Sequence, residues 1–187
     1  MTSDIYHDDQ GAPLSQSESI KRRLERDAAR LFMRAYEQRF HKSMRHIWHN
    51  QPAKPDISCY LDGEPLDLEI AHLYASDQEA RIASSSHHEA HSDYQGDEHL
   101  WAFLTELSSM DSGARLHAAL CRILESKARK HYRSERCWLI IRNASPLWSC
   151  KDFRQVIPHL TIPENPFEQI WLVPDFPGEE PILRIFP

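Results

Sequence analysis

The stretch Lys54-Pro-Asp-Ile-Ser-Cys-Tyr-Leu-Asp-Gly-Glu-Pro-Leu-Asp-Leu-Glu-Ile-Ala71 decides the fold of this chain. Two apolar runs, residues 57–61 and 66–74, lie on either side of the dipeptide Asp62-Gly63. Short apolar runs around Asp-Gly are typical of a β-hairpin, because both residues tolerate the backbone of a tight turn. The stretch therefore predicts two antiparallel strands.

Carboxylates lie inside this hairpin. Asp56 precedes the first run, and Asp67 and Glu69 lie within the second. Because side chains alternate along a strand, we expect Asp67, Glu69 and Ala71 to project from one side of it. Carboxylate oxygens are ligands that Mg²⁺ prefers, and one or two of them suffice to bind it. The pattern therefore indicates a candidate divalent-metal site.

Helical periodicity is strongest on either side of the hairpin. Apolar residues recur every three or four positions from residue 18 to about residue 47, which predicts a long amphipathic helix that ends before Gln51-Pro52. A short helix is expected at residues 98–107, and a longer one from residue 113 to about residue 132. Between them, residues 75–97 are polar and predict a long loop.

Further strands are expected toward the C-terminus. Residues 137–141 are wholly apolar and predict a buried strand, and two more strands are expected at 167–173 and 182–186, after a weak helix at 151–157. This order predicts an α/β fold, a mixed β-sheet flanked by helices in a single domain. Residues 1–17 are polar and without pattern, so we expect a loosely ordered N-terminus followed by one domain over residues 18–187.

These elements and motifs together resemble a known superfamily. Pro55-Asp56, followed after 12 residues by Glu69 in an apolar strand, is similar to the motif of the PD-(D/E)xK nucleases, the restriction-endonuclease-like superfamily. In that superfamily a helix precedes the hairpin that carries the carboxylates, and a second helix leads into a further strand. The resemblance covers residues from about 18 to 142.

The resemblance implies hydrolysis of phosphodiester bonds in DNA or RNA with Mg²⁺ or Mn²⁺. Asp56 and Glu69 would bind the metal together with the carbonyl of Ile70, and Asp67 is a further candidate ligand. The first helix often adds a carboxylate, for which Glu25 is the candidate. The resemblance also leaves open a homodimer that cuts two strands.

This chain departs from the motif at Ala71, where the superfamily has a lysine. Three explanations are open. Glu69 could itself replace the lysine if Asp67 and Glu69 are the motif pair. The amine could come from Lys127, which lies on the apolar stripe of the helix at 113–132, or from Lys130 one turn later. Finally, the site could be inactive, which would leave a binding or interaction protein on a nuclease-like fold.

Each candidate residue also has a structural interpretation. Asp56 could be a turn aspartate, Glu69 could belong to an edge strand, and Asp67 could be solvated near the turn. Glu25 could form a surface ion pair with Arg22 or a nearby arginine. The aliphatic stem of Lys127 could cover core surface while its ammonium reaches water.

Composition excludes several other classes. A net charge of -6 weakens non-specific nucleic-acid binding, although basic residues cluster at 21–26 and 127–133. No apolar run suits a membrane span and the N-terminus lacks a signal pattern, so we expect a cytoplasmic protein with no membrane partner. The chain has no glycine-rich phosphate loop and no Gly-x-Ser-x-Gly elbow.

The cysteines and histidines add no separate site. The four cysteines lack the close spacings of zinc or redox motifs, so we expect buried free thiols. His87 and His91 have the spacing of two zinc ligands on a helix, but they lie in a polar segment and we interpret them as incidental. Residues 143–187 carry no chemistry that the sequence identifies.

Overall fold

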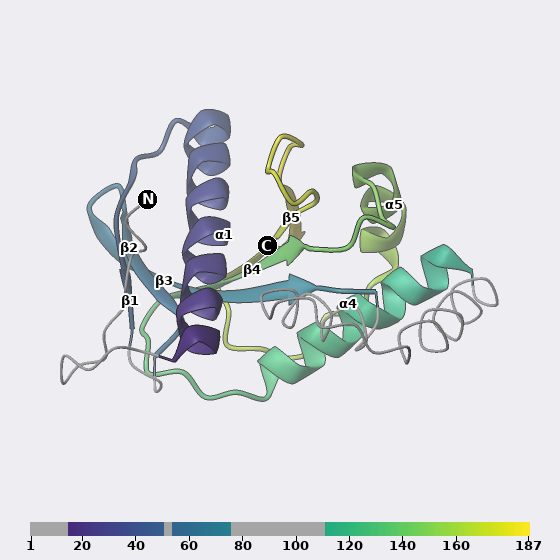
Figure 1. Cartoon of the computed structure of the whole chain (residues 1–187), viewed down its shortest axis with the longest axis horizontal. Coiled ribbons are helices and arrows are strands. Elements are labelled where there is room, and N and C mark those ends of the chain that lie inside the picture. Colours follow the sequence, from purple (N-terminus) through teal and green to yellow (C-terminus); the bar gives the residue numbers. More distant parts are fainter. Residues whose placement is uncertain (1–14, 51–53, 76–110) are drawn as a thin grey trace.

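The computed structural model describes residues 15–50, 54–75 and 111–187. They form one six-stranded sheet in the order β1-β2-β3-β4-β5-β6, with helices packed against it (Figure 1). The predicted α/β class with a mixed sheet flanked by helices is confirmed. The predicted loop at 75–97, the helix at 98–107 and the pair His87 and His91 lie outside the described residues, apart from Ala75.

The first helix, α1 (Gln16–Phe40), begins two residues before the predicted domain boundary at residue 18. Ser15 caps it, because its hydroxyl oxygen accepts a hydrogen bond from the N–H of Glu18 at 3.2 Å. It ends where His41 adopts a left-handed backbone, with φ at 56°. Residues 16 and 17, predicted to be loose, are therefore helical.

The prediction that this helix continues to residue 47 is wrong. Residues 44–49 form strand β1 (Met44–His49), which pairs antiparallel with β2. A bulge between Arg45 and Trp48, with His46 at φ 57°, lets Met44 and Ile47 pack against the same core. The bulge gives this strand a three-residue apolar spacing, which is why it resembles a helix in the sequence.

The predicted hairpin is confirmed. Strands β2 (Ile57–Leu61) and β3 (Glu64–Leu73) pair antiparallel around the turn Asp62-Gly63, where both residues have positive φ. Strand β3 then pairs parallel with β4 (Cys137–Asn143), which is buried along its whole length. Strand β5 (Gln169–Val173) pairs parallel with β4.

The remaining elements follow the predicted order with shifted ends. Helix α4 (Ser112–Ala128) ends earlier than expected. Helix α5 (Cys150–Val156) continues into a short 3-10 turn, η1 (Ile157–His159), and β6 (Leu183–Phe186) pairs antiparallel with β5. Figure 1 shows α1 in purple and α4 in teal lying at different inclinations to each other.

The core has two halves, one on each face of the sheet. On the α1 face, Phe32 and Tyr36 pack with Trp138 and Trp171, at ring-centroid distances of 5.3–6.3 Å. On the other face, residues of α4 and α5 pack on alternate residues of β4 and β5. Helices α1 and α4 therefore cover opposite faces, and β3 lies between them.

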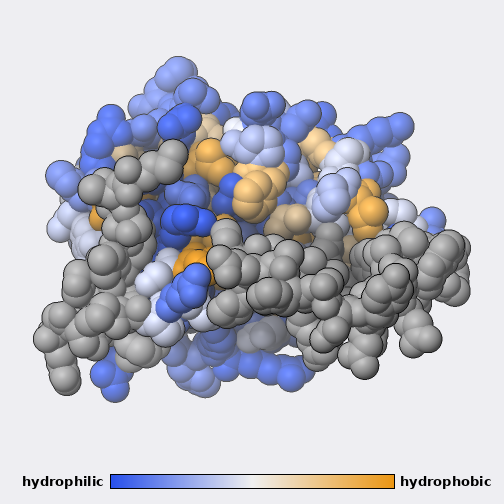
Figure 2. Space-filling model, in the orientation of Figure 1, coloured by the Kyte–Doolittle hydropathy of each residue, from blue (hydrophilic) through white to orange (hydrophobic). Residues whose placement is uncertain are grey.

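The surface of the described residues is mostly hydrophilic, as expected when the apolar residues pack on the two faces of the sheet. In the view of Figure 2, hydrophilic residues cover most of the described surface, and hydrophobic residues gather over the middle of this face. All four cysteines are free, but only Cys59 and Cys137 are buried, so the expectation of buried thiols holds for two of them. Within residues 15–50, 54–75 and 111–187, no helix is both long enough and apolar enough to cross a membrane.

Candidate functional site

The candidate site lies where the sheet opens. Strand β3 pairs with β2 through residues 64–68 and with β4 through residues 67–73. Beyond Leu68, one edge of β3 therefore no longer pairs with β2. Asp56 lies at this point, directly before β2 begins.

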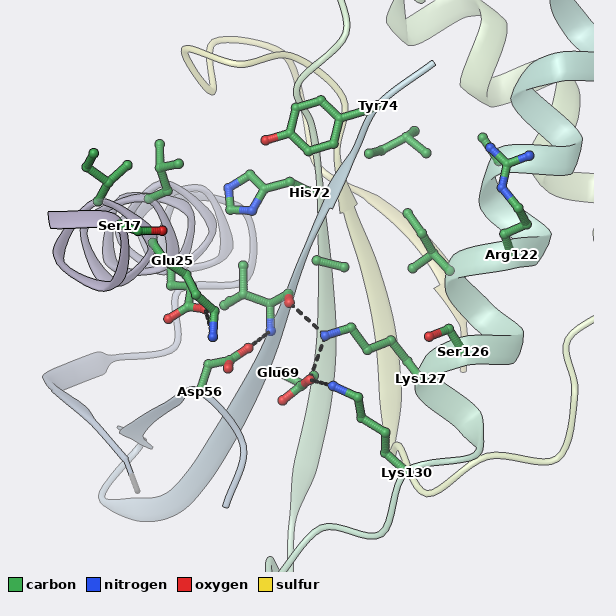
Figure 3. Close-up of a pocket in the computed structure, with 18 residues that line it drawn as sticks. Ser17, Glu25, Asp56, Glu69, His72, Tyr74, Arg122, Ser126, Lys127 and Lys130 are labelled. Atoms are coloured by element: carbon green, nitrogen blue, oxygen red, sulfur yellow. Dashed lines mark hydrogen bonds and ion pairs between the residues drawn. The ribbon is translucent and has the colours of Figure 1, made fainter. Parts of the chain in front are cut away.

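A cavity of about 740 Å³ follows this open edge. Its walls come from α1, β3 and α4, and Figure 3 shows their side chains converging on it. Five of the six predicted site residues line it, namely Glu25, Asp56, Glu69, Lys127 and Lys130. The fold therefore brings together charged groups from positions far apart in the sequence.

Asp56 lies at the point where β2 and β3 separate, and its side chain binds the main chain of β3. Its Oδ2 accepts a hydrogen bond from the backbone N–H of Ile70 at 2.9 Å. Alternation along β3 directs the N–H and C=O of Ile70 toward the open edge, because those of Asp67 and Leu73 bond on the β4 side. Burial raises the pKa of Asp56, and the negative charge of Glu69 raises it further.

Glu69 is held by two ammonium groups. The Nζ atom of Lys127 lies 2.6 Å from Glu69 Oε1 and donates a second hydrogen bond to the carbonyl oxygen of Ile70 at 3.1 Å. Lys130 Nζ lies 3.4 Å from the same carboxylate oxygen. The Glu69 side chain is 4% exposed and that of Lys127 is 17% exposed, so this ion pair is largely removed from water.

Glu25 supplies a third carboxylate from α1. Burial raises its pKa from 4.5 to about 7, the charge of Asp56 adds to this increase, and Lys21 opposes it. The interpretation of Glu25 as a surface partner of Arg22 or a nearby arginine is wrong, because Glu25 is buried, pairs with Lys21 at 3.7 Å and lies 4.0 Å from His49. Arg22 pairs with Glu18 instead.

Asp67 does not join the others. Its carboxylate accepts a hydrogen bond from the hydroxyl of Ser58, the residue opposite it on β2, and it lines a different hollow. Alternation does direct it to the same side as Glu69, but β2 is still paired with β3 at this position. Asp67 as a metal ligand is therefore not supported, and neither is the motif pair formed by Asp67 and Glu69.

Several lining residues were missed by the sequence reasoning. Lys21 lies one turn before Glu25, and that spacing could have indicated the ion pair. His72 and Tyr74 continue the alternation of Ile70 along β3 and line the same cavity. Arg122 and Ser126 precede Lys127 on α4, but nothing in the sequence distinguishes them from surface residues.

The donor set fits a magnesium or manganese ion only in part. In the described part of the chain, no three side chains of His, Cys, Asp or Glu form a group that could hold a metal ion. Asp56, Glu69 and the carbonyl of Ile70 supply oxygen donors, and Mg²⁺ commonly takes one or two carboxylates and keeps several waters. The raised pKa values of Glu25 and Asp56 mean that added positive charge would be favourable there.

Comparison with family models, with curated proteins and with solved structures found no match to this chain.

Proposed function

We propose that this protein is a metal-dependent nuclease on a restriction-endonuclease-like fold, in which Lys127 takes the place of the lysine missing at residue 71. The observation that carries the proposal is the position of Lys127. Its ammonium lies at Glu69 and Ile70, although it comes from α4 and the carboxylates come from the hairpin. Lys127 thus supplies positive charge close to Ala71, where the superfamily motif has its lysine.

The order and placement of the elements support the proposal. A helix that carries Glu25 precedes the hairpin, Asp56 lies where the hairpin opens, and α4 leads into the parallel strand β4. Carboxylates on the open edge of a sheet can reach a nucleic-acid backbone that enters from solvent. The basic residues Lys21, Arg122 and Lys130 line the same cavity and would attract phosphates despite the negative net charge.

Each residue of the site would have a separate role in cleavage. A Mg²⁺ or Mn²⁺ ion, when bound, supplies positive charge for the scissile phosphate and for an attacking water. Asp56, Glu69 and the carbonyl of Ile70 would hold it. Lys127 would stabilise the negative charge that develops on the phosphate, a contribution worth about 10² to 10³ in rate for a well-placed donor. Glu25, with its raised pKa, can accept a proton near neutral pH.

The test is cleavage of plasmid DNA, single-stranded DNA and RNA with Mg²⁺ or Mn²⁺. Glu69→Gln should abolish cleavage, Lys127→Met should lower its rate by about 10² to 10³, and EDTA should abolish cleavage by the wild-type protein. Glu125→Gln is the matched control, because Glu125 is exposed on α4 and pairs only with Arg129 in the described structure. Absence of cleavage of every substrate with both metals contradicts the proposal.

A second candidate is an inactive binding protein on the same fold. It is favoured by one observation, that Lys127 already neutralises Glu69 and contacts the Ile70 carbonyl, two of the oxygens that a metal would need. In that case calorimetry should detect no binding of Mg²⁺ or Mn²⁺. Glu69→Gln should also leave nucleic-acid affinity unchanged.

A further inference from the structure

The cavity extends beyond the carboxylates, and in Figure 3 this further part runs from Glu69 past His72 toward Tyr74, which directly follows β3. Apolar side chains of both helices line the cavity, namely Ile20 and Leu24 of α1 and Ala119 and Ile123 of α4. The whole cavity, at about 740 Å³, lies in the range of about 300 to 1,000 Å³ that is typical of small-ligand sites.

The main chain of His72 faces this space. Alternation directs its N–H and C=O away from β4, as it does those of Ile70. The Ile70 groups are taken by Asp56 and Lys127. No main-chain hydrogen bond joins the His72 groups to other residues in the described part of the chain. This leaves one donor and one acceptor side by side on the open edge.

The imidazole of His72 lines the same cavity. Its Nε2 is buried without a hydrogen-bond partner in the described residues.

Resting on the nuclease function proposed above, we propose that this part of the cavity binds one unpaired nucleobase next to the scissile phosphate. A base has two apolar faces and donors and acceptors in its plane. The aliphatic side chains of α1 and α4 can cover its faces, and the main chain of His72 can pair with its edge. The cavity is continuous with the carboxylates and lysines, where the phosphate of the same strand would lie.

Other occupants fit less well. An added peptide strand needs a series of main-chain hydrogen bonds, and only one residue of the edge has both groups without a partner in the described structure. A base within a duplex has its pairing edge occupied and its faces stacked. Proteins that read bases by their edges and faces do so on single strands, loops or ends. The proposed substrate is therefore single-stranded, or locally unpaired, nucleic acid.

The experiment measures binding of fluorescent oligonucleotides to the full-length Glu69→Gln protein with Mg²⁺, by anisotropy. It compares a short single strand, the same strand with one abasic position at its centre, and the duplex. Within the Glu69→Gln background, Ile123→Trp narrows the cavity, and Leu24→Phe narrows it from α1 if the first variant fails to fold. Leu147→Trp is the matched control, because Leu147 is 40% exposed and lies outside the cavity.

We expect the single strand to bind at least about tenfold more tightly than the duplex, and the abasic position to remove about tenfold, which corresponds to about 1.4 kcal/mol. Ile123→Trp should cost the intact strand a similar factor and the abasic strand almost nothing. Equal or tighter binding of the duplex overturns the proposal. Equal losses for intact and abasic strands also overturn it, as does the absence of oligonucleotide binding.

Cleavage assays separate the two proposals. If the wild-type protein cuts nucleic acid in a metal-dependent and Lys127-dependent manner but Ile123→Trp has no selective effect, the nuclease function stands and the base subsite fails. If no substrate is cut and no metal binds, the nuclease function itself fails.

Discussion

Lys127 Nζ lies 2.6 Å from Glu69 Oε1 and also donates a hydrogen bond to the carbonyl oxygen of Ile70. The same two oxygens belong to the proposed metal site. A lysine ammonium and a divalent cation repel each other at such short range and compete for the same lone pairs, so we expect metal binding to displace the ammonium. The Lys127 ammonium should therefore lower the affinity for the metal but raise the rate of cleavage.

The first prediction concerns Lys127→Met. Removing the ammonium frees the two oxygens and removes a repelling charge, so affinity for Mn²⁺ should rise by about tenfold or more. Cleavage should nevertheless fall by about 10² to 10³. Isothermal titration with Mn²⁺ and a cleavage assay measure the two effects, with the exposed Lys151→Met as the control. Weaker Mn²⁺ binding by Lys127→Met would falsify the proposal that the ammonium and the metal ion compete for these oxygens.

The second prediction concerns Ala71. This residue is 7% exposed and lines the cavity two positions after Glu69, so a lysine placed there can extend its amine into the open space. Adding Ala71→Lys to Lys127→Met should restore at least about one tenth of the lost rate, since the amine is the missing group. Ala71→Met in the same background controls for side-chain size and should restore nothing.

The third prediction concerns pH. The pKa of Glu25 is about 7 in the folded protein and 4.5 ordinarily, so the folded state keeps its proton longer than the unfolded state. The free energy of unfolding should therefore fall as pH rises from 4.5 through 7. Glu25→Gln removes this loss and should gain up to about 3 kcal/mol relative to wild type between pH 4.5 and 8, at about 1.4 kcal/mol per pH unit.

Urea unfolding of both proteins at several pH values measures this difference. Because other groups titrate in the same range, the quantity of interest is the gap between variant and wild type. Glu125→Gln, an exposed position on α4, should show a gap that does not change with pH. A constant gap for Glu25→Gln would mean that Glu25 titrates normally.

The fourth prediction concerns Asn143, at the end of β4. Its buried side-chain amide donates to the carbonyls of Trp148 and Pro174, at 3.0 and 2.9 Å, and its oxygen accepts the N–H of Ser145. Asn143→Ala leaves these backbone groups without partners and should lower the free energy of unfolding by about 3 kcal/mol. Chemical denaturation measures it. A loss below about 1 kcal/mol would show that water replaces the amide.

The sequence predicted the hairpin, the buried strand β4 and the order of the described elements from β2 onward, because each has a strong local pattern. The prediction failed at residues 44–49, where a strand has the apolar spacing that is typical of a helix. The bulge at His46 gave β1 the apolar spacing of a helix, and only pairing with β2 distinguishes the two. Positions of helix ends depend on such contacts and not on periodicity alone.

The site was partly predictable for a similar reason. Lys127 could be singled out because a charge on an apolar stripe needs a partner, and Glu69 proved to be that partner. Asp67 could not be separated from Glu69 by alternation, since both project from the same side of β3. The difference arises because β2 leaves β3 after Leu68, and no local sequence pattern marks that point.

The ammonium that faces Glu69 comes from the final turn of α4, only one residue before the helix ends at Ala128. Helix ends open more often than helix centres and much more often than buried strands. The carboxylates are thus fixed on the sheet, whereas the amine lies on an element that can fray. Local opening of this turn withdraws Lys127 while the core stays folded, so the charge balance of the site can change without global unfolding. Hydrogen exchange at this turn would measure how often it opens.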